Sequence, residues 1–486
     1  MRILQVCAEI FPLLKTGGLA DVAGALPPAL GALGADVRVL LPGFDAILAG
    51  LESPVEVARL QAPGEMGSHP ARLLRGRLPA AGVDAYVIDA PGWYRRAGGP
   101  YADAGQQSYA DNHLRFGLLG WTAAGLAQGL DASWQPEVVH AHDWHAGLVP
   151  AWLQAAATRG RPLPGCVFTV HNLAYQGMFP RACFDALGLP AHFFSIHGVE
   201  FHGQLNFMKA GLYYAERVTT VSPSYAREIQ GPEQGCGLDG LLRARAHELS
   251  GILNGVDAAV WDPATDALLP ARYMADDMAG KARCRSALRR ELGLAVKADG
   301  PLYCVVSRLT EQKGLHLVLH ALPALLAGGG QFALLGSGDA GLEAAFRDAA
   351  AATPDAVAVR LGYDEAFAHR LIAGSDVILV PSHYEPCGLT QLYGLKYGTL
   401  PLVRRVGGLA DTVADTRLET LDTDATGFVF EEFSAAALER TLQRARALHR
   451  RPAEWRRVRA RGMAQDFGWA RAAADYLALY RGLMPM

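Results

Sequence analysis

The chain has 486 residues, which is too long for one ordinary core, and a prior of roughly 150 residues per domain allows two or three domains. Half of the residues are hydrophobic (50%) and the formal net charge is only −3, so packed globular domains are expected, whereas a nucleic-acid or anionic-membrane surface is not. The seven cysteines show no short paired spacing, which is typical of reduced thiols in a cytoplasmic protein. We expect neither a secretory signal nor a membrane span, because the first apolar run is short and is broken by Glu9.

Short apolar runs alternate with longer amphipathic stretches along the whole sequence. The runs predicted as strands are 3–7, 38–41, 85–89, 137–140, 166–170, 217–221, 302–306, 332–335, 356–360, 376–380 and 400–403. Continuous apolar strands separated by helical patterns are typical of parallel sheets covered on both faces. The fold class is therefore α/β, with two doubly wound domains predicted over 1–255 and 256–455. A helical segment, 456–486, is expected to pack back on the first domain.

A glycine turn, Lys15-Thr-Gly-Gly-Leu-Ala-Asp21, follows the first predicted strand and precedes a helical pattern. Backbone N–H groups at such a helix start attract phosphate, and Lys15 adds a positive charge beside them. The pentapeptide Gly-Gly-Leu-Ala-Asp recurs over 407–411, again between an apolar run and a helical pattern. The repeat suggests two similar halves facing one anionic ligand.

Two further loops follow strands of the second half. In the loop 307–314, Arg308 and Lys313 are placed to bind a diphosphate, although a solvated basic loop has about even odds on local grounds. In the segment 384–390, Glu385 lies on a loop shaped by proline and glycine, at a strand end where α/β folds place ligand contacts. The alternative for this second loop is a simple capping turn.

Histidines gather at two strand ends of the first half. His171 and Asn172 are suited to hydrogen bonds with a sugar ring, with a buried and satisfied histidine as the equal alternative. The segment His140-Ala-His142-Asp143-Trp-His145 has the residue types of a zinc site, but the spacing scatters the rings along a strand and its loop. We therefore favour a substrate-facing loop there and expect no metal.

Two weaker patterns remain. The glycines of 336–341 match a dinucleotide fingerprint, but the acidic residue expected after the next strand is missing, so a nucleotide-contacting turn is plausible and NAD is not. The acidic pair Asp422 and Asp424 lies beyond the strongest predicted strands and is interpreted as a turn.

Together these motifs resemble bacterial glycogen synthases and plant starch synthases, glycosyltransferase family 5. The resemblance runs through essentially the whole chain, and its anchors are 15–22, 141–148, 170–177, 251–257, 307–314, 385–392 and 407–411. It implies the GT-B architecture, which has two Rossmann-like domains with the active site in the cleft between them. It also implies retaining transfer of glucose from ADP-glucose to the non-reducing end of an α-1,4-glucan, with no cofactor or metal.

The resemblance implies roles for individual residues. The catalytic residues would be Glu385, Arg308, Lys313 and His171. The donor-binding residues would be Lys15, Gly18, Asn172, Asn254, Tyr363, Cys387, Gly388, Leu389 and Thr390. The acceptor and cleft residues would be Asp21, Tyr94 and Asp143.

One position departs from the wider group of retaining GT-B enzymes. Many of these carry a second glutamate eight positions after the first, where this chain has Tyr393. Gln391 nearby fits the glycogen synthase pattern, so we do not interpret the change as a loss of activity. The alternatives are a phosphorylase-like transferase, a non-catalytic sugar-binding protein and, from the glycine pattern alone, a dehydrogenase.

Overall fold

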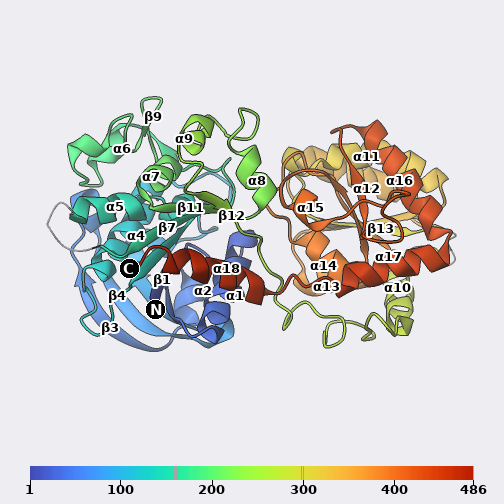
Figure 1. Cartoon of the computed structure of the whole chain (residues 1–486), viewed down its shortest axis with the longest axis horizontal. Coiled ribbons are helices and arrows are strands. Elements are labelled where there is room, and N and C mark those ends of the chain that lie inside the picture. Colours follow the sequence, from blue (N-terminus) through green and yellow to red (C-terminus); the bar gives the residue numbers. More distant parts are fainter. Residues whose placement is uncertain (158–162, 297, 299, 485–486) are drawn as a thin grey trace. The chain divides into compact units, whose positions relative to one another are not determined.

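A computed structural model describes residues 1–157, 163–296, 298 and 300–484. The chain divides into two compact units, one made of Met1–Gly255 with Trp469–Met486 and the other of Val256–Gly468 (Figure 1). The division after Gly255 lies where the sequence analysis places its first boundary. The second boundary differs, because residues 456–468 stay in the second unit and the return to the first unit begins at Trp469.

The first unit is built on a nine-stranded sheet. Its strands are β1 (Arg2–Val6), β2 (Asp36–Pro42), β3 (Glu52–Leu60), β4 (Ala71–Leu78), β5 (Val83–Asp89), β6 (Val138–His142), β7 (Gly165–Val170), β11 (Arg217–Thr220) and β12 (Leu249–Gly251). Their order is β12-β11-β7-β6-β1-β2-β5-β4-β3, parallel from β12 to β5 and antiparallel on both sides of β4. A small antiparallel sheet adds β8 (Met178–Phe179), β10 (Gln204–Asn206) and β9 (Glu200–Phe201).

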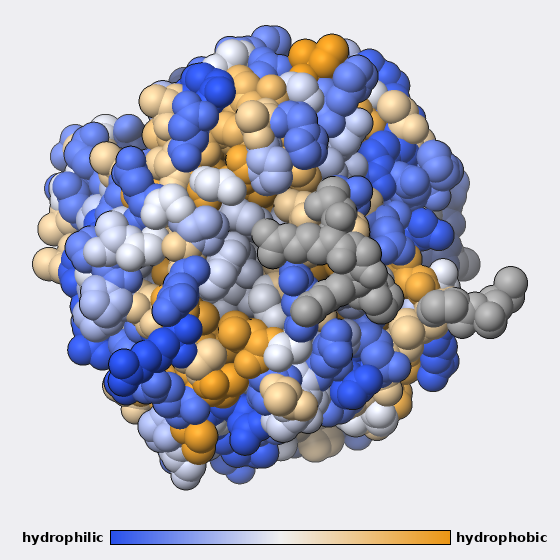
Figure 2. All heavy atoms as spheres, turned by 90° about the vertical axis from the view of Figure 1, so that its left-hand side faces the viewer, coloured by the Kyte–Doolittle hydropathy of each residue, from blue (hydrophilic) through white to orange (hydrophobic). Residues whose placement is uncertain are grey.

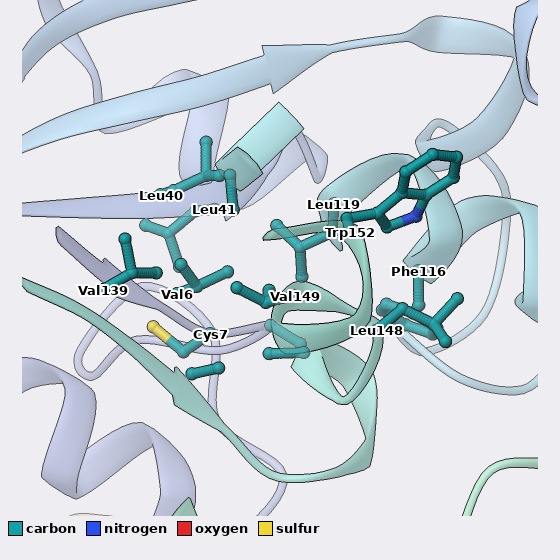
Figure 3. Close-up of a cluster of buried hydrophobic side chains, with 14 of the residues drawn as sticks. Val6, Cys7, Leu40, Leu41, Phe116, Leu119, Val139, Leu148, Val149 and Trp152 are labelled. Atoms are coloured by element: carbon teal, nitrogen blue, oxygen red, sulfur yellow. The ribbon is translucent and has the colours of Figure 1, made fainter. Parts of the chain in front are cut away.

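Helices cover this sheet. They are α1 (Gly18–Ala32), α2 (Asp45–Ala49), η1 (Gly64–Ser68), η2 (Pro79–Ala81), α3 (Pro91–Tyr94), α4 (Asn112–Ala127), η3 (Trp144–Ala146), α5 (Leu148–Ala157), α6 (Ala182–Asp185), η4 (Ala191–Phe193), α7 (Phe207–Tyr214), α8 (Pro223–Glu228), α9 (Asp239–Ala244) and α18 (Trp469–Arg481). Figure 3 shows Val6, Leu41 and Val139 of the sheet near Leu119 of α4 and Val149 of α5. Because both faces of the central strands are covered, β6 and β7 are buried at every position, as parallel strands usually are.

The helix α18 belongs to the core of the first unit. Tyr476 and Tyr480 of α18 pack in one buried cluster with Val22 and Leu26 of α1 and with Ile3 of β1. The apolar positions of α1 recur every three or four residues, which places them on the one face that α18 and the sheet cover. Figure 1 shows α18 lying beside α1.

The second unit has a six-stranded parallel sheet. In order across the sheet, its strands are β15 (Val357–Leu361), β14 (Gln331–Gly336), β13 (Leu302–Val306), β16 (Val377–Val380), β17 (Leu400–Arg404) and β18 (Phe428–Phe430). Its helices are α10 (Ala279–Leu292), η5 (Glu311–Lys313), α11 (Leu315–Ala327), α12 (Ala340–Ala352), α13 (Glu365–Gly374), α14 (Thr390–Lys396), α15 (Gly407–Thr412), α16 (Ala435–His449) and α17 (Pro452–Ala464). Two apolar clusters, one for each face of the sheet, form its core. The predicted α/β class with two doubly wound domains is confirmed.

The surface is largely polar where Figure 2 shows it. That face of the first unit carries mostly hydrophilic residues with small hydrophobic areas between them. Among the described residues, no helix combines the length and the apolar character needed to cross a bilayer.

Candidate active site

In each unit, polar side chains follow the strands at which the strand order reverses. β1 lies between β2 and β6 in the first unit, and β13 lies between β14 and β16 in the second. Chain segments that leave two such strands diverge to opposite faces of the sheet, which opens a crevice for ligands at the carboxyl ends of the strands. The predicted site residues therefore fall into two groups, one for each unit.

The glycine turn of the first unit begins α1. Gly17 is the residue before the helix and provides no side-chain cap for the first N–H groups, as expected for a turn that leaves donors to a ligand. Lys15 Nζ donates to Asp21 Oδ1 at 2.9 Å, and both side chains are less than one-fifth exposed (18% and 17%). Gly18 starts the helix and is exposed. Asp21 thus orients the ammonium group of the predicted donor loop.

Glu9 is a site residue that the sequence analysis missed. This buried carboxylate follows β1 and accepts from the backbone N–H of Thr16 at 2.5 Å. It also accepts from the hydroxyls of Thr16 and Tyr101. Glu9 therefore fixes the turn that carries Lys15. The signal in the sequence is a single charged residue shortly after an apolar strand.

Asp143 follows β6 in a strained backbone conformation. Its φ of 60° with ψ of −179° is a region that residues other than glycine rarely adopt. The backbone N–H of Asp143 donates to Thr169 at 2.8 Å, and its Oδ1 accepts from the backbone N–H of His171 at 3.3 Å. Burial raises the pKa of the Asp143 carboxyl to about 7, and Glu9 adds to the effect. Strain and a poorly solvated acid at one position are typical of functional sites.

The remaining first-unit residues follow β7 and β12, which are separated in the sheet by β11. His171 and Asn172 follow β7, and both are partly exposed. Asn254 follows β12 and is 6% exposed, and its Oδ1 has no hydrogen-bond partner among the described residues. A buried amide oxygen without a partner is costly, so this atom is suited to accept from a bound ligand.

Tyr94 differs from its predicted role as a cleft residue. It is 2% exposed, packs edge-on against Phe44 and donates its hydroxyl proton to the carbonyl of Arg115 at 2.7 Å. Its hydroxyl is thus used inside the core. Another tyrosine, Tyr101, bonds to Glu9 and stacks on His145 at 4.4 Å between ring centroids.

The histidines of the 140–145 segment do not form a metal site in the structure. Both ring nitrogens of His140 and of His142 are hydrogen-bonded to protein groups, and His145 stacks on Tyr101. Across the part of the chain that the structure describes, no group of three metal-ligating side chains converges. Asp422 and Asp424 are exposed in a turn, as expected, and Asp422 pairs with Arg457 at 2.7 Å.

In the second unit, Lys313 and Glu385 meet directly. Lys313 Nζ donates to Glu385 Oε2 at 2.6 Å, and the hydroxyl of Ser382 donates to the same oxygen at 2.8 Å. The two loops are also joined through Gln312, whose carbonyl accepts from His383 and whose amide donates to Tyr384. The two loops following β13 and β16 therefore hold a cation and a buried carboxylate together.

Arg308 and Tyr363 are more exposed. Arg308 lies on the same loop as Lys313, with its side chain at the surface. Tyr363 is 71% exposed and donates its hydroxyl proton to Glu365. An exposed ring is free of the core packing that would prevent stacking on a nucleotide base.

The segment Cys387, Gly388, Leu389 and Thr390 leads into α14. Gly388 has φ of +72°, and a Cβ there would lie 2.4 Å from the side-chain Oε1 of Gln391, so both the backbone and the space favour glycine. The Gln391 amide donates to the carbonyls of Cys387 and Gly388, which fixes the turn. This arrangement explains Gln391 as a residue that shapes the predicted donor-binding segment.

Tyr393, which stands where many related enzymes have a second glutamate, lies inside the second unit. It is 7% exposed, and its ring stacks on Trp261 at 3.8 Å with an interplanar angle of 4°. Trp261 also stacks on His369, with 3.7 Å between the ring centroids. The position of the second glutamate in related enzymes is here part of an aromatic stack inside the second unit.

Two glycine motifs have a packing role in the structure. A Cβ at Gly408 would lie 2.2 Å from the carbonyl of Cys387, and Gly408 N–H already donates to the carbonyls of Glu385 and Pro386. The second copy of Gly-Gly-Leu-Ala-Asp therefore supports the Glu385 loop, and its Gly408 N–H is not available to an anion. Gly336 and Gly338 similarly pack against the backbone of Ser307 and Leu309, and Asp339 caps α12, so that turn supports the Arg308 loop.

Known families and a solved structure match this chain along most of its length. A family model described as starch synthase catalytic domain matches residues 2–244, and one described as glycosyl transferases group 1 matches residues 292–458. The chain is 69% identical to glycogen synthase of Leptothrix cholodnii over 483 residues (99% of each chain) and 62% identical to that of Variovorax paradoxus over 489 residues (99% and 98%). The solved catalytic domain of starch synthase IV from Arabidopsis thaliana, bound to ADP and acarbose, superposes with a TM-score of 0.89 at 31% identity, covering 99% of both chains.

The two family models and this superposition define a glycosyltransferase with the GT-B fold. More closely, the chain belongs to the family of glycogen and starch synthases. The resemblance drawn from the motifs is thereby confirmed. Sucrose-phosphate synthase from Thermosynechococcus elongatus, with a TM-score of 0.59 at 18% identity, shares the fold alone.

Proposed function

We propose that the protein is a glycogen synthase, which transfers glucose from ADP-glucose to the non-reducing end of an α-1,4-glucan with retention of the anomeric configuration. The observation that carries this proposal is the pair of Lys313 and Glu385 at the strand-order reversal of the second unit, next to Arg308. It occurs in a chain that matches glycogen synthases over its full length.

The chemistry fits these groups. As the glycosidic bond to the diphosphate breaks, negative charge grows on the leaving group and positive charge grows on the sugar. Arg308 and Lys313 would stabilise the diphosphate, as preorganised cations do. Glu385 would keep Lys313 oriented and would lie near the developing positive charge on the sugar. His171, Asn172 and Asn254 would bind sugar hydroxyls.

No separate base or metal is needed in this scheme. The departing phosphate can take the proton of the acceptor hydroxyl on the same face of the sugar, which retains the configuration. Cations and helix N-termini supply the charge that a metal would otherwise provide. We therefore propose an enzyme that needs neither metal nor cofactor and acts in the cytoplasm on a nucleotide sugar and a glucan, without nucleic acid or membrane as a partner.

A donor panel tests this proposal. ADP-glucose, UDP-glucose and GDP-glucose are offered with glycogen, and both nucleotide release and glucose incorporation are measured. We expect incorporation with ADP-glucose, as α-1,4 linkages that β-amylase removes as maltose, and strongly reduced incorporation with Glu385→Gln. Nucleotide release without incorporation, or no turnover with any donor, would contradict the proposal. A bound pyridoxal phosphate, visible by absorbance, would instead indicate a phosphorylase-like enzyme.

A further inference from the structure

A buried chain of hydrogen bonds leads from His171 to the C-terminal helix. His171 Nε2 lies 3.0 Å from His142 Nδ1, and His142 Nε2 lies 2.6 Å from Gln5 Oε1. The amide of Gln5 donates to the hydroxyl of Tyr480 at 3.4 Å. That hydroxyl lies 2.7 Å from His140 Nδ1. We call these five residues the histidine relay, which joins β7, β6, β1 and α18 within the first unit.

Bulk water does not reach most of the relay. Gln5, His140, His142 and Tyr480 have no exposed surface, and His171 alone among the five is partly exposed. Each buried polar atom must therefore match a donor to an acceptor inside the protein. Burial lowers the pKa of His140 to about 3 and that of His142 well below its usual value, so both rings are neutral. A neutral imidazole has one donor nitrogen and one acceptor nitrogen.

The direction of each bond follows from Gln5. Its Oε1 can only accept, so His142 carries its proton on Nε2 and presents a lone pair at Nδ1. His171 Nε2 must then donate to that lone pair, which leaves the lone pair of His171 on Nδ1. At the other end, the Gln5 amide donates to the Tyr480 hydroxyl, whose own proton can then be donated to His140 Nδ1. A reversed Gln5 amide would reverse the donor and acceptor at every bond, including the tautomer of His171.

We propose that Gln5, His142 and Tyr480 are positioning residues that hold the proton of His171 on Nε2, so that its Nδ1 acts as an acceptor towards a sugar hydroxyl of the substrate. This inference rests on the proposed function for the nature of the substrate. It gives α18 a part in the chemistry, because the hydroxyl of Tyr480 accepts from the Gln5 amide in the direction that goes with this tautomer. Second partners of this kind commonly fix the tautomer of functional histidines.

Two variants and one matched control test the relay. Tyr480→Phe removes the hydroxyl and keeps the ring, and Gln5→Met removes the amide while keeping a side chain of similar length. Tyr476→Phe is the control, because it removes a hydroxyl from the same helix that belongs to none of the bonds named above. Folding of each variant is checked by its thermal transition, and Tyr480→Phe preserves the test if Gln5→Met does not fold.

The first measurement is spectroscopic and needs no substrate. The protonated and unprotonated nitrogens of a neutral imidazole have well-separated ¹⁵N chemical shifts, and His171→Asn assigns the signals of His171. We expect Nε2 protonated in the wild type and in Tyr476→Phe, and a mixture of tautomers in Tyr480→Phe and Gln5→Met. Protonation of Nδ1 in the wild type, or one unchanged tautomer in all variants, would overturn the proposal.

The second measurement is kinetic. We expect kcat to fall about tenfold in Tyr480→Phe and Gln5→Met with KM for ADP-glucose unchanged, because the lost hydrogen bond acts mainly in the transition state. A changed tautomer with unchanged kcat, or a lower kcat without a tautomer change, would also overturn it. If the wild type transfers no glucose at all, the proposed function fails, whereas the ¹⁵N result still decides whether the relay sets the tautomer.

Discussion

Lys313 and Glu385 form an ion pair at 2.6 Å although they are 72 residues apart in the sequence. Their side chains are 19% and 8% exposed, so the pair is largely shielded from water. The carboxylate thus restrains a cation that would otherwise move freely on a loop. When a diphosphate binds, Lys313 can add a contact to the phosphate without having to be ordered first, which lowers the entropic cost of binding.

Removal of either cation should slow transfer strongly. We expect Lys313→Ala and Arg308→Ala each to lower kcat by roughly 10²–10³-fold, the usual loss when one preorganised donor is removed from a developing charge. Initial rates of ADP release with glycogen measure the effect. Lys396→Ala is the control. It also removes a lysine that forms an ion pair, since Lys396 at the end of α14 pairs with Asp262 at 3.1 Å, but it belongs to neither of the two loops. Near wild-type turnover in both variants would contradict the assignment.

Lys15 should affect how well the donor is held. In Lys15→Ala the turn before α1 keeps its glycines and its bond to Glu9 but loses the ammonium group. We expect a higher KM for ADP-glucose and a higher ratio of hydrolysis to glucan transfer, because a loosely held donor is more open to water. Parallel assays of free glucose and of glucose in glycogen measure the ratio. Asp21→Asn keeps the lysine and should show a smaller effect in the same direction. If wild type and Lys15→Ala have equal ratios of hydrolysis to transfer, the turn has only a structural role.

The backbone strain at Asp143 should appear as a stability difference between two variants that both lack the carboxylate. Both Asp143→Gly and Asp143→Ala remove the carboxylate, but glycine accepts a φ of 60° without strain and alanine does not. We expect Asp143→Gly to be more stable than Asp143→Ala by about 1–3 kcal/mol, the usual cost of such a conformation. Urea unfolding followed by circular dichroism measures the difference. Equal stability would mean that the backbone relaxes in both variants.

The Asp143 carboxyl should also make stability depend on pH. Burial raises the pKa of Asp143 from 3.8 to about 7, so the folded state favours the protonated acid. The unfolding free energy should therefore fall as the pH rises from about 4 to about 7, since the charged carboxylate is better solvated in the unfolded chain. Asp143→Asn cannot ionise and should lose less stability between pH 5 and pH 8 than the wild type. Parallel loss in both proteins, measured by thermal unfolding, would assign the pH dependence to other groups.

Activity should survive removal of divalent metals. We expect dialysis against EDTA to leave the rate unchanged, because the proposed chemistry stabilises the diphosphate with Arg308 and Lys313. The rate is measured before dialysis, and again after dialysis once the chelator has been removed. A loss of activity that Mg²⁺, Mn²⁺ or Zn²⁺ restores would refute this and direct attention back to the histidines of 140–145.

The sequence predicted the buried parallel strands well, because their apolar runs are continuous. It missed β3 and β4 at the edge of the first sheet. The first five positions of β3 are exposed, so its residues show no apolar run to detect. It also missed β18, which has three residues and is too short for any pattern. Edge and very short strands are defined by pairing partners distant in the sequence, and local composition does not reveal them.

The candidate site was predictable where residues share a loop and less so where they meet only in three dimensions. The motif placed Lys313 and Glu385 on separate loops, but their ion pair depends on the order of β13 and β16 in the sheet. Tyr94 came from the family resemblance alone, and nothing in the local sequence shows that its hydroxyl bonds inside the core or that Tyr101 reaches Glu9. The glycines of 336–341 resembled a phosphate turn, since close backbone packing and phosphate binding both require the absence of a side chain.

The return of the chain at Trp469 has a consequence for synthesis on the ribosome. The cluster beneath α1 includes Val22 and Ile3 from the beginning of the sequence and Tyr476 and Tyr480 from its last helix. While residues 256–468 are being translated, the face of α1 that α18 covers has no partner from its own unit. The unit that is synthesised first is therefore completed last. Until residues 469–484 leave the exit tunnel, the apolar face of α1 stays exposed and can bind chaperones.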